Sequence, residues 1–517
     1  MSDLIEILQD LFTLEILVPW ILAMIFGIFV GSTPGLTATM AVALVIPLSY
    51  NLPKEAALAM VIGVSFTAIF AGDIPATFLR IPGTPASAAA TLDAHQLAKK
   101  GKGNQTLLIN LLCSALGGVL GVVILMSVAP QLAKLALLFS SFEYFWLCLL
   151  GLTLGVTVSS GNYKLLGALA AIFGVLLATV GNDVTTYQER YMFGNSDLST
   201  GLSFIPAMIG LFGISEVIRA VYRYNPAGTA ATIDQETNHD NSSSGLADDS
   251  PFKVRESLQI IAANTPTIAQ SVVTGTVIGG LPGAGADIAA WGAYGIAHKT
   301  AKPVEQAKFG SGIWKGVIAP TSANNAAVAA AWIPALVFGV PGDAVTAIVL
   351  GAFLTYDITP GPELFSGGGA NFIFAIAMIT QLLLIPAGLV GILLFGKFMR
   401  LPRAIVLSCV VIFSVVGAYA MNNNPFDVWI MFGFGLLGVF LESRKVPLAP
   451  LILGMILGPK VETYFRQGMI SAQGDFSNAF QSTIDIVLFS SLVICILLSF
   501  GLTIRRATTS HPTSATQ

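Results

Sequence analysis

The amino-acid sequence predicts an all-α polytopic membrane protein, and three observations lead to that fold class. Only 10% of the 517 residues are charged while 54% are hydrophobic, and the mean hydropathy is +0.78. A soluble protein carries about 25% charged residues, so this chain cannot cover a soluble globule. Uncharged runs repeatedly approach the roughly 20 residues that a helix needs to cross a bilayer. The 52 Gly and 26 Pro further predict that some of these helices are interrupted.

The apolar runs predict about 12 membrane segments. Some runs have the length of a simple span: 106–129, 144–163, 165–182, 198–215, 370–395, 404–426 and 486–504. Other runs are shorter or interrupted, which indicates Pro-Gly-broken helices or re-entrant hairpins: 16–53, 56–92, 257–297, 309–356, 428–441 and 446–459.

A single long hydrophilic stretch divides the chain almost in half and has the composition of a flexible linker. Two matched motifs, described next, indicate that the parts on either side are repeats. We therefore expect a first membrane repeat over 1–222, a cytoplasmic linker over 223–256, a second membrane repeat over 257–504 and a cytoplasmic tail over 505–517.

Two motifs occur once in each half, in the same order. The stretch "GIFVGSTPGL" (27–36) matches "GTVIGGLPGA" (275–284) at two glycines and a Pro-Gly pair, with an offset of 248 residues. Further on, "IPATFLRIPG" (74–83) matches "IPALVFGVPG" (333–342), with an offset of 259 residues. One match alone is a plausible accident in a Gly-rich chain. Two matches in the same order indicate an internal duplication.

The loop charges predict that the two halves have opposite orientations in the membrane. In the first half the basic loop "HQLAKKGKG" (95–103) follows the second motif. In the second half the basic loop "HKTAKPVEQAK" (298–308) lies between the two motifs. Because Lys and Arg collect in cytoplasmic loops, equivalent loops face opposite sides, as inverted-topology repeats require. Further basic loops near the end of the chain place the C-terminus in the cytoplasm.

The Pro-Gly pairs within these motifs are the candidate binding elements. Proline removes a backbone N–H and glycine frees φ, so each pair is expected to break a helix. In lipid such a break persists only where protein or a water-filled cavity satisfies the freed backbone groups. A half-helix N-terminus can hold a carboxylate, and unwound carbonyls can coordinate a cation such as Na⁺. Four breaks, two in each half, therefore predict a site for a small anion and a coupling cation at the repeat interface.

The same stretches carry a family resemblance. "GSTPGLTATMAVALVIPL" and "VIGGLPGAGADIAAWGAYG", together with "IPGTPAS" and "ITPGPELF", resemble signature segments of the large permease subunit of the tripartite tricarboxylate transporters. The resemblance implies a bacterial inner-membrane protein that works with a small membrane subunit and a periplasmic solute-binding protein. It also implies uptake of a di- or tricarboxylate or a related organic acid, driven by a cation gradient that is usually taken to be Na⁺. By motif match, it places Pro34, Gly35, Pro282 and Gly283 at the heart of the site.

We expect two sets of site residues around the four breaks. The substrate-binding set is Thr33, Pro34, Gly35, Thr37, Pro82, Gly83, Thr84, Pro282, Gly283, Ala284, Gly285, Asn324 and Asn325. The ion-binding set is Thr39, Asp287, Pro341, Gly342 and Asp343. Helix N-capping is the structural alternative for the two aspartates. Asp73 is left out of both sets because it can pair with Arg80.

Other classes of function are less well supported by the residues. The sequence contains no catalytic constellation, metal-ligand cluster or cofactor motif, so we expect neither an enzyme nor a bound cofactor. The net charge of −3 does not suggest a nucleic-acid partner. A passive anion channel lined by the same broken helices stays open as an alternative. Elevator and rocking motions both suit inverted repeats.

Overall fold

The computed structural model describes residues 7, 9–33, 36–161, 163–183, 186–223, 252–398 and 403–509. Most of the predicted linker, residues 224–251, and the last residues of the predicted tail, 510–517, lie outside this part of the chain. The described chain is predominantly helical. It contains one antiparallel strand pair, β1 (Gly181–Asn182) with β2 (Glu189–Arg190).

The first half contains the following helices in chain order: α2 (Leu14–Ser32), α3 (Ala38–Ser49), α4 (Lys54–Ala71), α5 (Asp73–Leu79), η1 (Pro85–Ser87), α6 (Ala88–Leu97), η2 (Ala98–Lys102), α7 (Gly103–Ala136), α8 (Ser141–Ser159), α9 (Lys164–Ala178), η3 (Ser196–Leu198), α10 (Phe204–Met208), η4 (Ile209–Ile214) and α11 (Ser215–Arg223). The second half contains α12 (Val254–Ala263), α13 (Thr265–Gly279), α14 (Gly285–Thr300), α15 (Pro303–Gln306), α16 (Trp314–Phe338), α17 (Ala344–Thr355), α18 (Glu363–Ser366), α19 (Gly369–Phe398), α20 (Arg403–Asn422), α21 (Pro425–Ser443), α22 (Leu448–Ser471), η5 (Phe476–Phe480) and α23 (Thr483–Thr509).

Apolar helices of membrane-spanning length confirm the predicted fold class, an all-α polytopic membrane protein. Among the described residues, eight helical segments are long and apolar enough to cross a membrane: Leu14–Ser32, Lys54–Leu79, Pro85–Ala136, Ser141–Ser159, Phe204–Tyr222, Gly369–Lys397, Ala404–Asn422 and Pro425–Ser443. Four shorter apolar helices accompany them: Ala38–Ser49, Lys164–Ala178, Ala344–Thr355 and Thr483–Ser499. The total of about 12 segments and the inverted repeats stay predictions.

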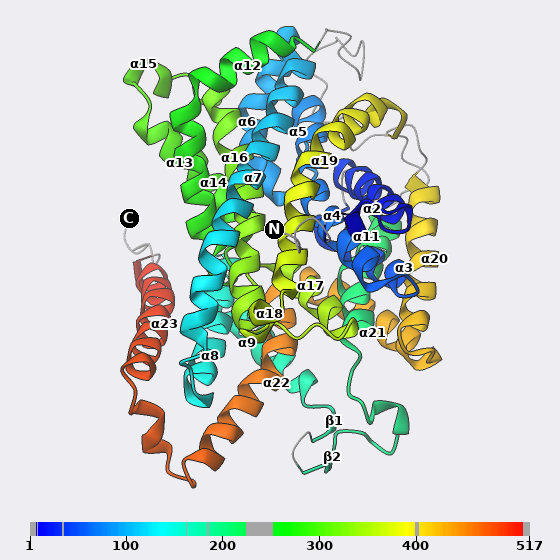
Figure 1. Ribbon diagram of the computed structural model, residues 1–517, viewed down its shortest axis with the longest axis vertical. Coiled ribbons are helices and arrows are strands. Elements are labelled where there is room, and N and C mark those ends of the chain that lie inside the picture. Colours follow the sequence, from blue (N-terminus) through cyan, green and yellow to red (C-terminus); the bar gives the residue numbers. More distant parts are fainter. Residues whose placement is uncertain are drawn as a thin grey trace, which may run out of the picture.

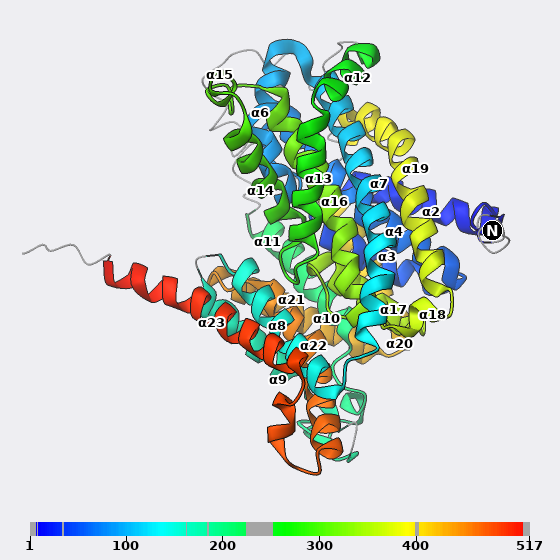
Figure 2. The same cartoon turned by 60° about the vertical axis from the view of Figure 1, so that its left-hand side comes forward.

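Helix α16 lies at the centre of the molecule and is buried along almost its whole length. It packs against α7, α13 and α14, with which it runs along the long axis of the molecule (Figures 1 and 2). Its sequence is rich in alanine, and small side chains allow helix backbones to approach closely where lipid offers no hydrophobic driving force. The central helix therefore joins elements of both halves.

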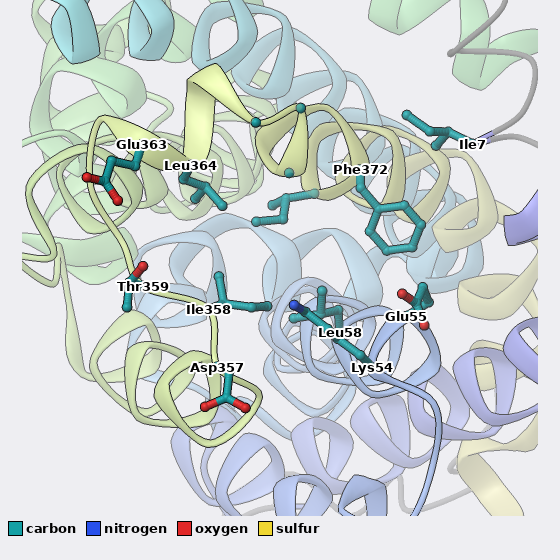
Figure 3. A pocket seen from close by; sticks show the side chains of 14 residues that line it. Ile7, Lys54, Glu55, Leu58, Asp357, Ile358, Thr359, Glu363, Leu364 and Phe372 are labelled. Atoms are coloured by element: carbon teal, nitrogen blue, oxygen red, sulfur yellow. The ribbon is translucent and has the colours of Figure 1, made fainter.

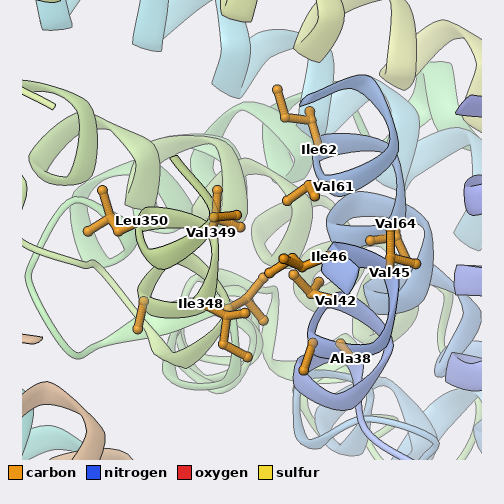
Figure 4. Close-up of a cluster of buried hydrophobic side chains, with 14 of the residues drawn as sticks. Ala38, Val42, Val45, Ile46, Val61, Ile62, Val64, Ile348, Val349 and Leu350 are labelled. Atoms are coloured by element: carbon orange, nitrogen blue, oxygen red, sulfur yellow. The ribbon is translucent and has the colours of Figure 1, made fainter. Parts of the chain in front are cut away.

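A second contact between the halves is apolar. Helices α3 and α4 of the first half pack with α17 of the second half, and Val42, Ile46 and Ile348 lie in the shared cluster (Figure 4). Beta-branched side chains have few accessible rotamers, so these side chains can pack with little loss of rotamer freedom. Each of these two short helices, α3 and α17, begins directly after a Pro-Gly break.

Helix α23 and the strand pair β1–β2 lie at the periphery of the molecule (Figures 1 and 2). Helix α23 contacts α8 and η5 and projects from the body of the molecule (Figure 2). The strand pair is held to α22 by charge, because Arg190 donates to Glu462 at 2.9 Å and also pairs with Asp183. Arg466 reaches the same Asp183 carboxylate at 3.0 Å. This charged cluster fixes the 181–190 hairpin beside the end of α22.

Candidate functional site

The four Pro-Gly segments interrupt helices where the sequence predicts them. The intervening residues are 33–37 between α2 and α3, 80–84 between α5 and η1, 280–284 between α13 and α14, and 339–343 between α16 and α17. Pro34 and Gly35 of the first break lie outside the described residues. The remaining residues show how each break is held.

The two breaks of the second half contact each other through their backbones. Gly283 N–H donates to the Gly342 carbonyl at 2.7 Å. Gly283 has a φ of +82°, and a Cβ atom at this position would lie 2.1 Å from Gly155 Cα on α8. Gly285 has a φ of +62°, and its Cβ would lie 3.0 Å from Asp343 Cβ. Positive φ and backbone contact together require glycine at position 283.

The second break of the first half is held by backbone contacts with Gly72 and with the end of α2. Gly83 N–H donates to the Gly72 carbonyl at 3.1 Å. A Cβ atom at Gly83 would lie 2.2 Å from the Gly31 carbonyl oxygen near the end of α2. The next residue, Thr84, is buried, and its hydroxyl has no hydrogen-bond partner among the described residues. Pro82, in contrast, is exposed. A buried hydroxyl without a partner is a group available to a ligand.

Side chains already cap two of the helices that start at the breaks. Thr37 accepts a hydrogen bond from Met40 N–H at the start of α3, at 3.2 Å. Asp343 accepts from Thr346 N–H at the start of α17, at 2.7 Å. Helix α14 has no side-chain cap. Its first N–H groups can therefore receive an anion.

The two predicted acidic ion ligands lie near each other. Asp343 Oδ1 is engaged in capping α17, which confirms the N-capping alternative for this residue. Asp287 lies exposed in the first turn of α14, close enough for its charge to act on Asp343. Of the remaining ion-set residues, Thr39 is half-buried in the first turn of α3, and Pro341 and Gly342 are buried.

Asn324 and Asn325 lie inside continuous helix α16 and away from any loop. Both are buried, and both carry side-chain atoms without a hydrogen-bond partner among the described residues. Asn325 Nδ2 donates to the Ser114 carbonyl on α7 at 3.3 Å. One turn earlier, the Thr321 hydroxyl donates to Asn110 Oδ1 at 3.1 Å. The equal spacing of these two contacts means that α7 and α16 run parallel, with their polar side chains facing each other.

Asp73 belongs to neither predicted set of site residues. It starts α5, is fully buried, and neither of its carboxylate oxygens has a hydrogen-bond partner among the described residues. Thr321 of α16 approaches this carboxylate. The expected pairing with Arg80 is wrong, because Arg80 is exposed at the end of α5 with a φ of +59° and does not reach Asp73. A lone Asp in the uncharged run 56–79 was the signal that could have identified it.

A surface cleft of about 510 Å³ lies elsewhere. It is lined by Lys54 and Glu55 at the start of α4 and by Asp357, Thr359 and Glu363 of the segment that joins α17 to α19 (Figure 3). None of the four breaks contributes to its lining. The candidate site is therefore the set of breaks and the buried polar side chains beside them.

Apolar helices of spanning length and the interrupted helices among them are the features of a polytopic membrane protein, and such interruptions occur in solute transporters. The chain belongs to the tripartite tricarboxylate transporter TctA family, whose model matches residues 17–453. It is thus the large membrane subunit of such a transporter. The family is one of transporters and not of enzymes.

Two relatives come from Agrobacterium vitis. An "uncharacterized 52.8 kDa protein in TAR-I ttuC' 3'region" is 33% identical over 454 residues, which cover 87% of this chain and 86% of the relative. An "uncharacterized protein in TAR-II ttuC' 3'region" is 37% identical over 233 residues, which cover 45% of this chain and 96% of the relative. No solved structure matches the chain significantly.

Proposed function

We propose that this chain imports a small carboxylate across the bacterial inner membrane, driven by a cation gradient, in symport with Na⁺. The substrate is a di- or tricarboxylate or a related organic acid. A periplasmic solute-binding protein delivers the substrate, and a small membrane subunit completes the complex. Membership of the tripartite tricarboxylate transporter family supports the class of transport and the two partners.

The uncapped start of α14 is the observation that carries the substrate site. Its N–H groups have no side-chain cap and are available to an anion. The glycines at 283 and 285 allow Gly155 and Asp343 to pack closely against the backbone there. Helix α14 also contacts η1, which directly follows Gly83 and Thr84 of the first half. A carboxylate at the α14 N-terminus that also reached this segment would touch a break from each half. Asp287 and Asp343 supply carboxylate oxygens for a cation at the same junction.

Loop positions support inverted repeats. The first basic loop contacts the segment that directly follows the second one, because Lys100 Nζ donates to the Ser311 carbonyl at 2.7 Å. Asp93 of α6 binds the same second-half segment and accepts from Gly310, Gly312 and Ile313 N–H at 2.9, 2.8 and 3.0 Å. The first-half basic loop follows both motifs of its half, whereas the second-half basic loop lies between the two motifs of its half. Two halves with opposite orientations would bring these two loops to the same side of the membrane.

Glycine contacts support the internal duplication. A Cβ at Gly31 would lie 2.2 Å from the Ala68 carbonyl oxygen, and a Cβ at Gly279 would lie 2.3 Å from the Ala327 carbonyl oxygen. Gly31 and Gly279 are equivalent at the offset of 248 residues, and Ala68 and Ala327 at the offset of 259. The same helix-to-helix contact thus recurs in each half. The Gly-x-x-x-Gly pairs serve this close packing.

Uptake of radiolabelled citrate tests the proposed function, followed by a panel of other carboxylates. Proteoliposomes would contain this chain and its small membrane subunit, with and without the binding protein, under an imposed Na⁺ gradient. We expect uptake that requires both the gradient and the binding protein, and that Gly283→Leu abolishes. Gly433→Leu is the matched control, since nothing lies within 4 Å of a Cβ there. Uptake that persists after both Na⁺ and H⁺ gradients are collapsed would refute symport. Channel-like currents in electrical recordings would favour the passive alternative.

A further inference from the structure

Asp73 lies buried in the interior without a partner. Its side chain has no exposed surface, and neither carboxylate oxygen accepts a hydrogen bond from a described residue. The described ion pairs do not include it. An ionised carboxylate in such a place is very costly unless a positive charge compensates it. His95 of α6 is hydrogen-bonded to the Thr77 carbonyl at 3.1 Å and does not pair with the Asp73 carboxylate.

The group facing Asp73 has its lone pairs available. Thr321 approaches the carboxylate, but its hydroxyl proton is donated to Asn110 Oδ1 at 3.1 Å. The hydroxyl oxygen keeps lone pairs that can bind a cation. A cation or a proton between them stabilises a buried carboxylate beside such an oxygen.

We propose that the Asp73 carboxylate and the Thr321 hydroxyl oxygen bind one Na⁺, with Asn110 holding the Thr321 hydroxyl in the required orientation. Carboxylate and hydroxyl oxygens are the hard donors that suit this ion. The site is distinct from the Asp287–Asp343 junction. It deepens the proposed function, and it rests on that function for its role in coupling.

The position of Asp73 links this cation to the first-half breaks. The preceding residue, Gly72, accepts the hydrogen bond from Gly83 N–H at 3.1 Å. A Cβ at Gly72 would lie 2.4 Å from Thr84 Oγ1, which shows how closely the two segments are packed. A bound Na⁺ that fixes the start of α5 therefore also fixes residues 83 and 84, where the substrate is expected. Ligands that stabilise the same conformation bind cooperatively.

Direct binding of ²²Na⁺ to the purified complex in detergent tests the site without any carboxylate or binding protein. We expect Asp73→Asn to bind one Na⁺ fewer per chain than the wild type, or to bind it at least tenfold more weakly. Thr321→Val, which keeps the charge and the shape, should weaken the same site severalfold. Asp10→Asn is the matched control and should keep full Na⁺ binding, because Asp10 is exposed and lies outside both proposed cation sites. A second readout is thermal stabilisation by NaCl relative to choline chloride, which Asp73→Asn should lose.

Full Na⁺ binding by Asp73→Asn overturns the proposal. If that variant does not fold, Thr321→Val decides, because unchanged Na⁺ affinity in a folded Thr321→Val variant overturns it too. A complex whose uptake follows an H⁺ gradient and that binds no Na⁺ also overturns the site, while carboxylate import stands. Conversely, Asp73-dependent Na⁺ binding in a complex that moves no carboxylate supports the site and refutes the transport function.

Discussion

Replacing Gly283 by alanine tests how tightly the second-half break is held. A left-handed φ of +82° costs an L-residue roughly 1–2 kcal/mol. The added Cβ would also lie 2.1 Å from Gly155 Cα, where carbon atoms prefer about 3.5–4.0 Å, and overpacking of this kind costs about 1–3 kcal/mol. We expect Gly283→Ala to lose about 2–5 kcal/mol of stability. It should also lose uptake, because α8 is pushed away from the break.

Two control variants separate the cost of the left-handed φ from the cost of the contact with Gly155. Gly101 also has a positive φ, +69°, but nothing lies within 4 Å of its Cβ position, so Gly101→Ala should show the conformational cost alone. Gly433 lies in α21 with free space around it, so Gly433→Ala should match or exceed wild-type stability. Thermal unfolding of the purified variants in detergent should find Gly433→Ala the most stable, Gly101→Ala intermediate and Gly283→Ala the least stable. A Gly283→Ala protein as stable as Gly101→Ala would show that α8 does not press on the break, and the reasoning would fail.

Two further predictions concern buried carboxylates that hold elements together. Asp93→Ala leaves three backbone N–H groups without their acceptor and should lower stability by at least about 3 kcal/mol, whereas Asp93→Asn, which retains Oδ1, should lose less in the same thermal unfolding assay. Asp183→Ala removes the common partner of Arg190 and Arg466. Because both arginines are partly exposed, we expect a loss of about 1–3 kcal/mol and faster proteolysis of the 181–190 hairpin. An unchanged cleavage rate would show that the charged cluster does not hold the hairpin.

The breaks could be predicted from the sequence because their cause is local. Proline and glycine act on the backbone at their own positions, so all four breaks fall where the Pro-Gly pairs lie. The Asp343 cap is local as well, since its partner is three residues away. The fold class followed from composition and from the length of the apolar runs.

The buried polar side chains could not be located in this way, because their partners are distant in sequence. Whether Asn325 faces lipid or Ser114 depends on the register between α7 and α16, which pair residues 211 positions apart. Asp73 and Arg80 are seven residues apart, which suggests one helix face. The chain instead turns into the left-handed region at Arg80 and carries that side chain outward. Such outcomes depend on tertiary packing, which no local pattern specifies.

The contact between α6 and residues 310–313, which follow the second-half basic loop, bears on the transport motion. Asp93 binds residues 310–313, so elements of both halves that carry the breaks are joined at this point. If the halves rocked against each other, this contact would have to open in each cycle. An elevator motion, in which the breaks of both halves move as one body, leaves it intact. We therefore expect the joined elements to move together.

A disulfide tests that expectation. A Cβ at Gly312 would lie 3.2 Å from Gln96 Cβ, close to the roughly 3.5–4.5 Å that a disulfide spans. Oxidation of a Gln96→Cys/Gly312→Cys double variant should therefore join the halves, and uptake should continue at the rate of the reduced protein. The single variants control for the substitution at Gly312, whose φ is +96°. Loss of uptake on oxidation, restored by reduction, would instead show that this contact opens during transport and would favour rocking of the two halves.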